Sequence, residues 1–357
     1  MKNIFLKHPT KPVKVASKDL AELLEEMRYV GFQGRKLGEL TEAWVSMLQE
    51  DKIVIFMGLA GAMVPAGMRR VISYLIRKRM IDVLVSTGAN LYHDCHEALG
   101  RKHYLGTPNV NDVILRKHYV DRIYDIFANE KGFYKTDLWI QNEFAQSLED
   151  GYPYSSREIL HLLGKKLSER KTAKNSILVS AYRADVPIFC PAINDSSLGF
   201  SIMFANRKPS VAKLRKGKAQ KRIIIDCLKD VDEISKICEK ARVTAGIYIG
   251  GGVPKNYIQQ AAVIASYQTR HNRSHNYGLQ ITMDSPQWGG LSGCTLEESQ
   301  SWGKYDANAK IVTCYCDATI ALPIVAHALM EKAERIAERR KKPSFRWEKD
   351  SFKLKFV

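Results

Sequence analysis

Short apolar runs alternate with amphipathic stretches along most of this 357-residue chain. Apolar runs that stop at glycine or at a polar turn are typical of buried strands, and a spacing of three and four between apolar residues is typical of helices. The pattern predicts strands at 52–58, 81–87, 186–190, 222–226, 245–249, 280–283 and 310–316. Strands that alternate with helices indicate a parallel sheet covered on both faces.

The helices are expected between these strands. They are predicted from the turn 59–65 to about Lys78, from the turn at 88–90 to about Leu99, at about 231–240, after 250–252 with Pro254 in the first turn, and at 321–342. The pattern therefore predicts an α/β fold with one large, doubly wound, mainly parallel sheet of the Rossmann-like kind. We expect a helical extension at 1–40, a single large domain at 41–342 and a tail at 343–357, with 106–151 as an appended stretch.

Composition places the chain among globular proteins, because 45% of its residues are apolar and 26% are charged. No apolar run reaches the roughly 18–20 residues that span a bilayer. The residues Met1–His8 lack a long apolar core and a small-residue cleavage site, so no secretory signal is expected. The seven cysteines form no C-x-x-C pair, which argues against a disulfide framework and favours a cytoplasmic location.

The formal net charge is +17, from 55 Lys and Arg against 38 Asp and Glu. Such an excess first indicates nucleic acid or an anionic membrane surface as a partner. The densest basic stretch, Arg207–Arg222, has eight basic residues and no acidic one, yet it has no aromatic residue to stack a base and matches no reading motif. A solvated basic loop is the favoured interpretation, and neither nucleic acid nor a membrane is expected as a partner.

His93 and His96 lie three residues apart, and we expect them on one face of a helix. This spacing allows a metal pair or ordinary polar contacts near the start of the helix. No clear third ligand accompanies them, so no metal is predicted and His93 is expected to line a pocket.

Four strands are followed by small or polar turns, at 58–61, 86–90, 194–199 and 250–252. Ligands of open α/β sheets bind beyond the carboxyl ends of the strands, and glycines there let a phosphate approach the amides of a helix N-terminus. None of the turns is a complete G-x-G-x-x-G motif or P-loop, but together they favour a nucleotide cofactor.

The segment 282–304 contains the clearest candidate for chemistry. Thr295 and Glu298 have the spacing of a capping box, so a short helix is expected to present Trp302 and Lys304 at its far end. A lysine beside tryptophan in a dry cleft has a lowered pKa and can form an imine. From the spacing alone, an ordinary surface lysine remains the favoured interpretation.

Several segments resemble deoxyhypusine synthases, in the same order and with similar spacing. The likeness covers about residues 30–335 and rests on Val83-Leu-Val-Ser-Thr87, Pro191-Ala-Ile-Asn-Asp-Ser-Ser-Leu-Gly199, Ile249-Gly-Gly-Gly-Val-Pro-Lys255, Ser301-Trp-Gly-Lys304 and Cys316-Asp-Ala318. The resemblance implies an NAD-dependent transferase that moves the aminobutyl group of spermidine. In that family the group is carried as an imine on the lysine of Ser-Trp-Gly-Lys, which is Lys304 here, and passes to an acceptor amine.

The resemblance also implies roles for other residues. Trp302 matches a tryptophan that packs on the polyamine, and Glu298 matches a carboxylate that holds a substrate ammonium. Asn256, Asp284 and His93 complete the expected substrate contacts. The expected NAD contacts are Gly61, Ala62, Thr87, Gly88, Ala89, Asp195, Ser197, Gly251 and Asp317. The family forms homotetramers with active sites at a dimer interface, and this assembly is expected here by implication.

Some positions depart from the eukaryotic enzymes. Phe200 and Leu291 stand where those enzymes have aspartates, Asn256 where they have histidine, and His93 where they have glutamate. About seven residues are inserted around 270–276. These changes indicate a rebuilt substrate pocket, in which Asp284 and Glu297 are replacement carboxylates for a dication.

Three functions stay open at this point. An aminoalkyl transferase that uses a Lys304 imine comes first, with either a protein lysine or a small diamine as acceptor, the latter giving a homospermidine-type product. A nucleic-acid-binding protein and a catalytically inactive NAD-binding protein are the alternatives. Because polyamines are themselves cations, the net charge of +17 cannot recruit them, and local carboxylates have to do so.

Overall fold

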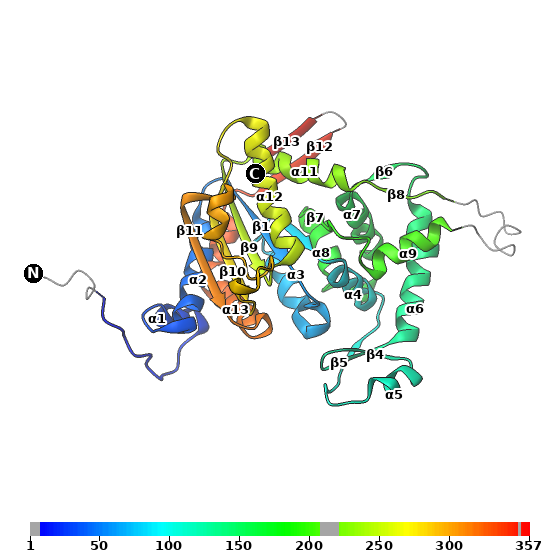
Figure 1. The fold of residues 1–357 in the computed structure, drawn as a ribbon, viewed down its shortest axis with the longest axis horizontal. Coiled ribbons are helices and arrows are strands. Elements are labelled where there is room, and N and C mark those ends of the chain that lie inside the picture. The colour runs from blue at the N-terminus through cyan, green and yellow to red at the C-terminus, as the bar shows by residue number, and fades with distance from the viewer. Residues whose placement is uncertain (1–7, 208–220, 349–350) are drawn as a thin grey trace, which may run out of the picture. The chain divides into compact units, whose positions relative to one another are not determined.

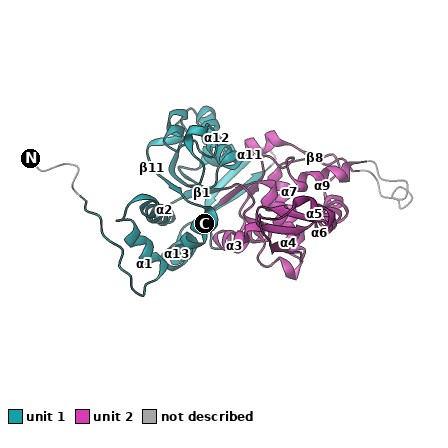
Figure 2. Cartoon of the chain, turned by 60° about the horizontal axis from the view of Figure 1, so that its bottom comes forward, with its two compact units in different colours: residues 1–58, 78–82, 235–357 teal, residues 59–77, 83–234 magenta. Residues whose placement is uncertain are grey.

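The computed structural model describes residues 8–207, 221–348 and 351–357, so most of the basic stretch Arg207–Arg222 lies outside the described residues. The chain divides into two compact units (Figure 2). Unit 1 comprises Met1–Gly58, Lys78–Asp82 and Ser235–Val357, and unit 2 comprises Leu59–Arg77 and Val83–Ile234. The single domain expected at 41–342 stays a prediction.

Unit 1 is built on four neighbouring strands in the order β11, β10, β9 and β1 (Figure 1). Their bounds are Ile53–Leu59 for β1, Val243–Ile249 for β9, His275–Thr282 for β10 and Tyr305–Tyr315 for β11. β10 pairs in parallel with both β9 and β11. Every residue of β1 is buried, as expected for a strand in the middle of a covered sheet.

Helices cover this part of the sheet. α2 packs on β10 and β11 and against α13, α1 packs on α2 and α13, and α12 packs on β9. The bounds are Leu20–Met27 for α1, Phe32–Gln49 for α2, Cys227–Lys240 for α11, Gly252–Thr269 for α12 and Ala318–Arg339 for α13. Pro254 lies in the first turn of α12, where the missing N–H costs nothing.

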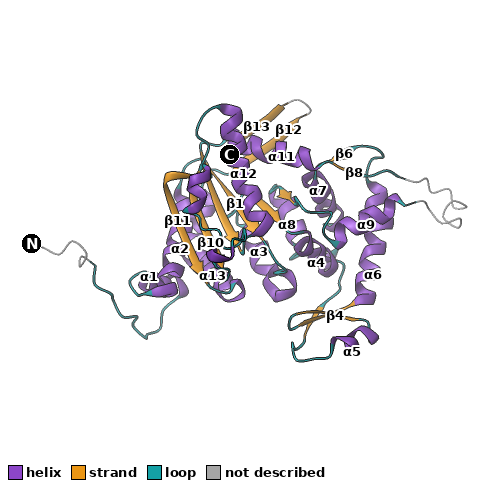
Figure 3. Cartoon of the chain, viewed as in Figure 1, coloured by secondary structure: helices purple, strands orange, loops and turns teal. Residues whose placement is uncertain are grey.

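Unit 2 is mostly helical (Figure 3) and contains the parallel pair β2 and β7. Those strands span Val83–Ser86 and Ile188–Phe189. Its helices are η1 (Val64–Met68), α3 (Arg69–Arg77), α4 (Gly88–Ala98), α5 (Asp112–Lys117), α6 (Glu130–Trp139), η2 (Ile140–Phe144), η3 (Ala145–Ser147), α7 (Ser156–Leu167), η4 (Lys171–Ala173), α8 (Ile177–Ala184) and α9 (Ser197–Asn206). α7 starts with a complete capping box between Ser155 and Glu158.

The structure confirms the expected α/β class with a mainly parallel sheet, and it adds detail that the hydrophobic pattern did not give. The expected strand at 222–226 is β8 (Ile224–Ile225), which pairs with β6 (Pro153–Tyr154) in a separate two-stranded sheet. The appended stretch 106–151 contributes β4 (Val120–Ile123) and β5 (Ile126–Asn129), which form an antiparallel sheet with β3 (His103–Leu105).

The C-terminal helix ends earlier than predicted. α13 stops at Arg339 rather than at 342, and the tail forms an antiparallel hairpin of β12 (Pro343–Glu348) and β13 (Ser351–Phe356). Phe345 and Phe352 are buried, so the hairpin has an apolar face of its own. Within the described ranges, no helix combines the length and apolarity that crossing a bilayer demands.

Candidate active site

The loop between β10 and β11 in unit 1 presents the candidate nucleophile. It contains the short 3-10 helices η5 (Pro286–Trp288) and η6 (Glu298–Trp302). Part of the expected capping box is present, because the Glu298 N–H donates to Thr295 Oγ1 at 3.0 Å, while Glu297 stands at the N-cap position of η6. Gly303 ends η6 in the left-handed region, with φ of 67°, and this turn leads the chain from Trp302 directly into Lys304.

Lys304 is buried, with 8% of its surface exposed. Its Nζ donates to Asn256 Oδ1 on α12 at 3.0 Å. Burial lowers the pKa of the Lys304 amine from its ordinary value, while the nearby Cys294 and Glu298 oppose this shift. A lysine with a lowered pKa is more often neutral, and a neutral amine is the form that attacks a carbonyl or an imine carbon.

Three other predicted substrate residues, Trp302, Glu298 and Asp284, lie in the same loop as Lys304. Lys304 Nζ lies 5.9 Å from the ring centroid of Trp302, whose side chain is 67% exposed and free to receive a ligand on its face. Glu298 is exposed. Asp284 is half-buried, and its Oδ1 accepts the N–H of Ser285 at 3.1 Å. The structure thus brings Lys304, Asn256 and Trp302 together.

A second lysine was missed by the sequence reasoning. Lys255 is fully buried on α12, and its Nζ donates to Gln280 Oε1 at 3.0 Å and to the carbonyl of Cys294. Burial, together with the positive charge of the nearby Lys304, lowers the pKa of Lys255 to about 8. Gln280 in turn donates to the carbonyl of Ser292 at 2.8 Å, so one buried network ties α12 and β10 to the loop before η6.

The spacing in α12 held a signal for this lysine. Lys255, Ile258, Gln259 and Ala262 are all buried and follow the three- and four-residue spacing of one helix face. A lysine on a buried, largely apolar face needs a buried partner, because an unpaired ammonium there is costly.

Replacing Lys255 with methionine is expected to remove a pH-dependent part of the stability. The folded chain holds this amine at a pKa of about 8 against an ordinary value of 10.5, so the unfolded chain binds more protons between these values. Stability therefore rises with pH across this interval, by about 3 kcal/mol for the whole shift. Urea denaturation at several pH values should show the difference between wild type and Lys255→Met growing with pH. A difference that stays flat would contradict the assignment.

The predicted cofactor residues of unit 2 cluster in the turns after β1 and β2. Thr87 Oγ1 donates to the carbonyl of Gly61 at 2.9 Å, and Asn90 Nδ2 donates to the same carbonyl at 3.1 Å. Gly88 is packed so closely on Ser196 that a Cβ would lie 2.3 Å from Ser196 Oγ. The turn at Thr87, Gly88 and Ala89 is thus joined to the turn at Gly61 and Ala62, and its Gly88 lies against Ser196 at the start of α9.

Asp195 and Ser197 flank Ser196, the N-cap of α9, whose Oγ accepts the N–H of Gly199 at 3.3 Å. Asp195 is exposed and Ser197 is half-buried. Their side chains sit at a helix N-terminus next to the Gly88 turn, which is where ribose hydroxyls or phosphates bind in comparable folds.

In unit 1, Gly251 and Asp317 each begin a helix. Gly251 is the N-cap of α12, and a Cβ there would lie 2.4 Å from Ser292 Cα. Asp317 is the N-cap of α13, and its Oδ1 accepts the N–H of Thr319 at 2.7 Å. Hydrogen bonds from Thr319 lower the pKa of the Asp317 carboxyl. The Asp317 carboxylate therefore caps the N-terminus of α13.

His93 lies on α4 in unit 2, and its nearest polar partner is His103 on β3, at 2.9 Å between Nδ1 and Nε2. His96 instead bonds to Thr136. Among the described residues, no group of three or more His, Cys, Asp and Glu side chains has an arrangement able to hold a metal ion.

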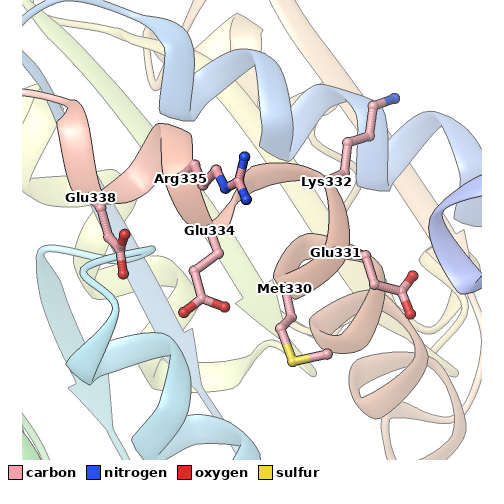
Figure 4. Close-up of a pocket in the computed structure, with 6 residues that line it drawn as sticks. All are labelled: Met330, Glu331, Lys332, Glu334, Arg335 and Glu338. Carbon is pink, nitrogen blue, oxygen red and sulfur yellow. The ribbon is translucent and has the colours of Figure 1, made fainter.

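One pocket of about 590 Å³ lies along the last turns of α13 (Figure 4). Its acidic side chains are engaged: Glu331 accepts the N–H of Ala21 at 2.8 Å, and Glu334 and Glu338 pair with Lys78. None of the predicted site residues lines it, so this pocket adds nothing to the candidate active site.

The inserted residues around 270–276 lie at the end of α12 and the start of β10. His275 is fully buried there, with Nδ1 2.8 Å from Thr244 Oγ1. Burial lowers the pKa of His275 to about 4, so it is neutral near pH 7. His275 is therefore a core residue at the start of β10, bonded to Thr244 of β9.

Comparison with known proteins points to a single family. The family described as deoxyhypusine synthase matches residues 22–329. A protein named "Probable deoxyhypusine synthase 2" from Methanosarcina acetivorans is 53% identical over 346 residues, which are 97% of this chain and 96% of the relative. Its namesake from Archaeoglobus fulgidus is 49% identical over 85% of this chain and 96% of the relative.

More distant relatives carry related names. A "Deoxyhypusine synthase-like protein" from Coxiella burnetii is 36% identical over 91% of this chain and 90% of its own length. Among solved structures, a candidate deoxyhypusine synthase from Entamoeba histolytica matches 88% of this chain and 94% of its own, with a TM-score of 0.58 and 17% identity. At that identity the likeness concerns the fold alone.

Proposed function

Because the chain belongs to the deoxyhypusine synthase family, a family of transferases, we propose that it transfers an aminobutyl group from a polyamine such as spermidine to an acceptor amine. The observation that carries this proposal is the buried Lys304, whose amine has a lowered pKa and is held by Asn256. Among the described residues, the Lys304 amine is hydrogen-bonded to no charged side chain, and a buried lysine of this kind suits covalent imine chemistry better than a structural ion pair.

The residues present fit NAD as the cofactor. At Gly61 and Gly252 the backbone has φ of 65° and 57°, and a Cβ at either position would meet no atom within 4 Å. Each turn therefore offers open backbone next to a helix start, which a pyrophosphate requires. The proposed contacts are Gly61, Ala62, Thr87, Gly88, Ala89, Asp195 and Ser197 in unit 2, and Gly251 and Asp317 in unit 1. When bound, NAD would take a hydride from the carbon beside the secondary amine of the donor and return it to the product.

The chain's own side chains account for the remaining steps. The neutral amine of Lys304 attacks the oxidised carbon, forms a C=N bond to the aminobutyl group and releases diaminopropane. Asn256 Oδ1 orients that amine by accepting one of its hydrogens. The exposed face of Trp302 covers the apolar methylenes of the substrate, and the Glu298 carboxylate pairs with a terminal ammonium. The acceptor amine then displaces Lys304 from the imine carbon.

A small diamine is a second candidate acceptor, in place of a protein lysine. Leu291 is 46% exposed and Phe200 is 50% exposed. Both therefore present apolar surface at positions where the eukaryotic enzymes that this chain resembles have aspartates. This change of lining indicates a rebuilt pocket, in which a small diamine, with two ammonium groups against one in a lysine side chain, would rely on Asp284 and Glu297 as its carboxylates. The names of the relatives support a protein lysine instead, since deoxyhypusine is a modified lysine.

Mass spectrometry of the products tests the proposal and separates the acceptors. The enzyme is incubated with NAD and spermidine, together with either putrescine or candidate acceptor proteins. Release of diaminopropane is expected, accompanied by homospermidine in the first case or by a lysine that has gained one aminobutyl group in the second. A panel of polyamines from which no diamine is released would favour a catalytically inactive NAD-binding protein. The expected homotetramer is measured on the same sample by light scattering.

A further inference from the structure

Two buried tyrosines of unit 1 share a hydrogen bond that the chemistry described above does not use. Tyr305 directly follows Lys304 at the start of β11, and Tyr248 lies in β9. The Tyr305 hydroxyl donates to the Tyr248 hydroxyl at 2.7 Å. Burial raises the pKa of both phenols, so both stay protonated. The residue after the candidate nucleophile is thereby tied to a strand two places away in the sheet.

A pair of glycines makes room for the two rings. β10 lies between β9 and β11 (Figure 1), and Gly278 of β10 is the register partner of Gly246 of β9. A Cβ at Gly278 would lie 2.7 Å from Tyr305 Cε1, and a Cβ at Gly246 would lie 2.1 Å from Tyr248 Oη. The two rings therefore lie over this glycine pair, where any larger residue would displace them.

The helix α12 acts on both of the consecutive residues Lys304 and Tyr305. Asn256 accepts the hydrogen bond of the Lys304 amine. Gln259 is buried, and its side chain opposes the rise in the pKa of both phenols that burial causes. Asn256 and Gln259 are three residues apart, so they are neighbours on the surface of the helix. A shift of Tyr305 along α12 would therefore move Lys304 away from Asn256.

The backbone of Lys304 is held from two sides as well. Its N–H donates to the Ser299 carbonyl at 3.2 Å, and its carbonyl accepts the N–H of His275 at 3.0 Å. These bonds tie Lys304 to η6 and to β10, whereas the Tyr305 hydroxyl ties the next residue to β9.

We propose that Tyr305 and Tyr248 are positioning residues, whose hydroxyl pair fixes the chain at Lys304 so that its amine stays in hydrogen-bond contact with Asn256. The inference rests on the proposed function, in which that amine carries the aminobutyl group. A reacting atom displaced by about 1 Å costs up to about a hundredfold in rate. Both phenols lie in the core of unit 1, so the binding of substrate and NAD should depend on them little.

Kinetics of two phenylalanine variants test this role. Tyr248→Phe and Tyr305→Phe keep the rings that lie over the glycines and remove one hydroxyl each. Each is expected to lower kcat about tenfold, with the KM for spermidine and the affinity for NAD within about twofold of wild type. The double variant should lose no more than either single variant, because one hydrogen bond can be lost only once. Unchanged kcat values, additive losses, or a change confined to KM would overturn the inference.

Ser180→Ala is the matched control. Ser180 Oγ and Ser73 Oγ form another buried hydroxyl pair, also at 2.7 Å, in unit 2. This variant is expected to lose a similar amount of thermal stability and to keep the kcat of wild type. An equal fall of kcat in Ser180→Ala would contradict the positioning role, since lost stability alone would then explain the tyrosine variants.

NMR of the lysine amines tests the positioning without substrate. The whole protein is labelled with ¹³C,¹⁵N-lysine, and the spectrum of Lys304→Arg identifies the Lys304 signal. Burial holds the pKa of this amine below its ordinary value of 10.5, although Cys294 and Glu298 oppose the shift. Tyr248→Phe is expected to move the pKa toward 10.5 as the amine becomes more exposed, and Ser180→Ala to leave it unchanged.

The outcomes of the NMR titration separate the two proposals. A Lys304 pKa that is the same in wild type and in Tyr248→Phe would refute the positioning role. A protein that shows the expected shift but transfers no aminobutyl group as wild type would refute the proposed function instead, and the hydroxyl pair would still be the group that places Lys304.

Discussion

Replacing Lys304 with alanine is expected to lower product formation by about three orders of magnitude or more, and to leave NAD affinity within about twofold. The amine is the proposed covalent carrier, and no other described group donates to the same Asn256 oxygen. The proposed NAD contacts are turn backbones and helix starts that this side chain does not build. Rates are measured as diamine release, and NAD affinity by titration calorimetry.

Lys310→Ala is the matched control for that variant. Lys310 lies in the adjoining strand β11, and its Nζ bonds to Ser46 Oγ at 3.1 Å. This change should leave turnover near that of wild type. Transfer that survives in Lys304→Ala would refute the imine proposal, whereas a loss of NAD binding along with activity would indicate a misfolded site.

Replacing Gly251 with alanine is expected to lower activity by about ten- to hundredfold and to lower the thermal midpoint by several degrees. The added Cβ would lie 2.4 Å from Ser292 Cα, so the backbone of one segment has to move. Ser292 Oγ accepts the N–H of Gly252 at 3.0 Å, and its carbonyl accepts from Gln280. The shift would therefore reach the network that holds Lys255 and the loop before η6. Turnover and calorimetric melting measure the two effects.

Gly31→Ala provides the comparison, because a Cβ at Gly31 would meet nothing within 4 Å and the residue also caps a helix. This variant should keep nearly full activity. If Gly251→Ala behaved like Gly31→Ala, the contact with Ser292 would not organise the site.

The strand and turn pattern predicted most of the fold, because buried strands and helix starts have local signatures. The run Lys52–Gly58 became β1, and Thr295 with Glu298 marked the start of η6, six residues before Lys304. The strand at 222–226 was placed in the central sheet by the same rule, yet β8 pairs with β6. An apolar run predicts a strand, but it does not predict which other strand pairs with it.

The missing part of the site depends on contacts between distant segments. The Lys255 amine reaches Gln280 because the fold brings α12 beside β10. No spacing within either segment predicts that Lys255 also donates to the Cys294 carbonyl. His103 was not singled out, since it lies ten residues from His93 and is brought beside it by the turn into β3. Burial of Lys304 likewise became apparent only once the loop was placed.

Recognition of a cationic substrate is local in this account. The net charge of +17 opposes the approach of a polyamine, and screening confines that opposition to about 8–10 Å at physiological salt. Within that range, the carboxylates of the exposed Glu298 and the half-buried Asp284 act electrostatically on Lys255. The same two carboxylates are the groups that would attract the ammonium ions of the substrate.

Borohydride trapping tests the central claim most directly. The enzyme is mixed with NAD and spermidine, reduced with borohydride during turnover, digested and analysed by mass spectrometry. We expect one added aminobutyl group on the peptide that contains Lys304, dependent on both NAD and spermidine. A turning-over enzyme whose trapped group appeared on Lys255 or on no lysine would contradict it.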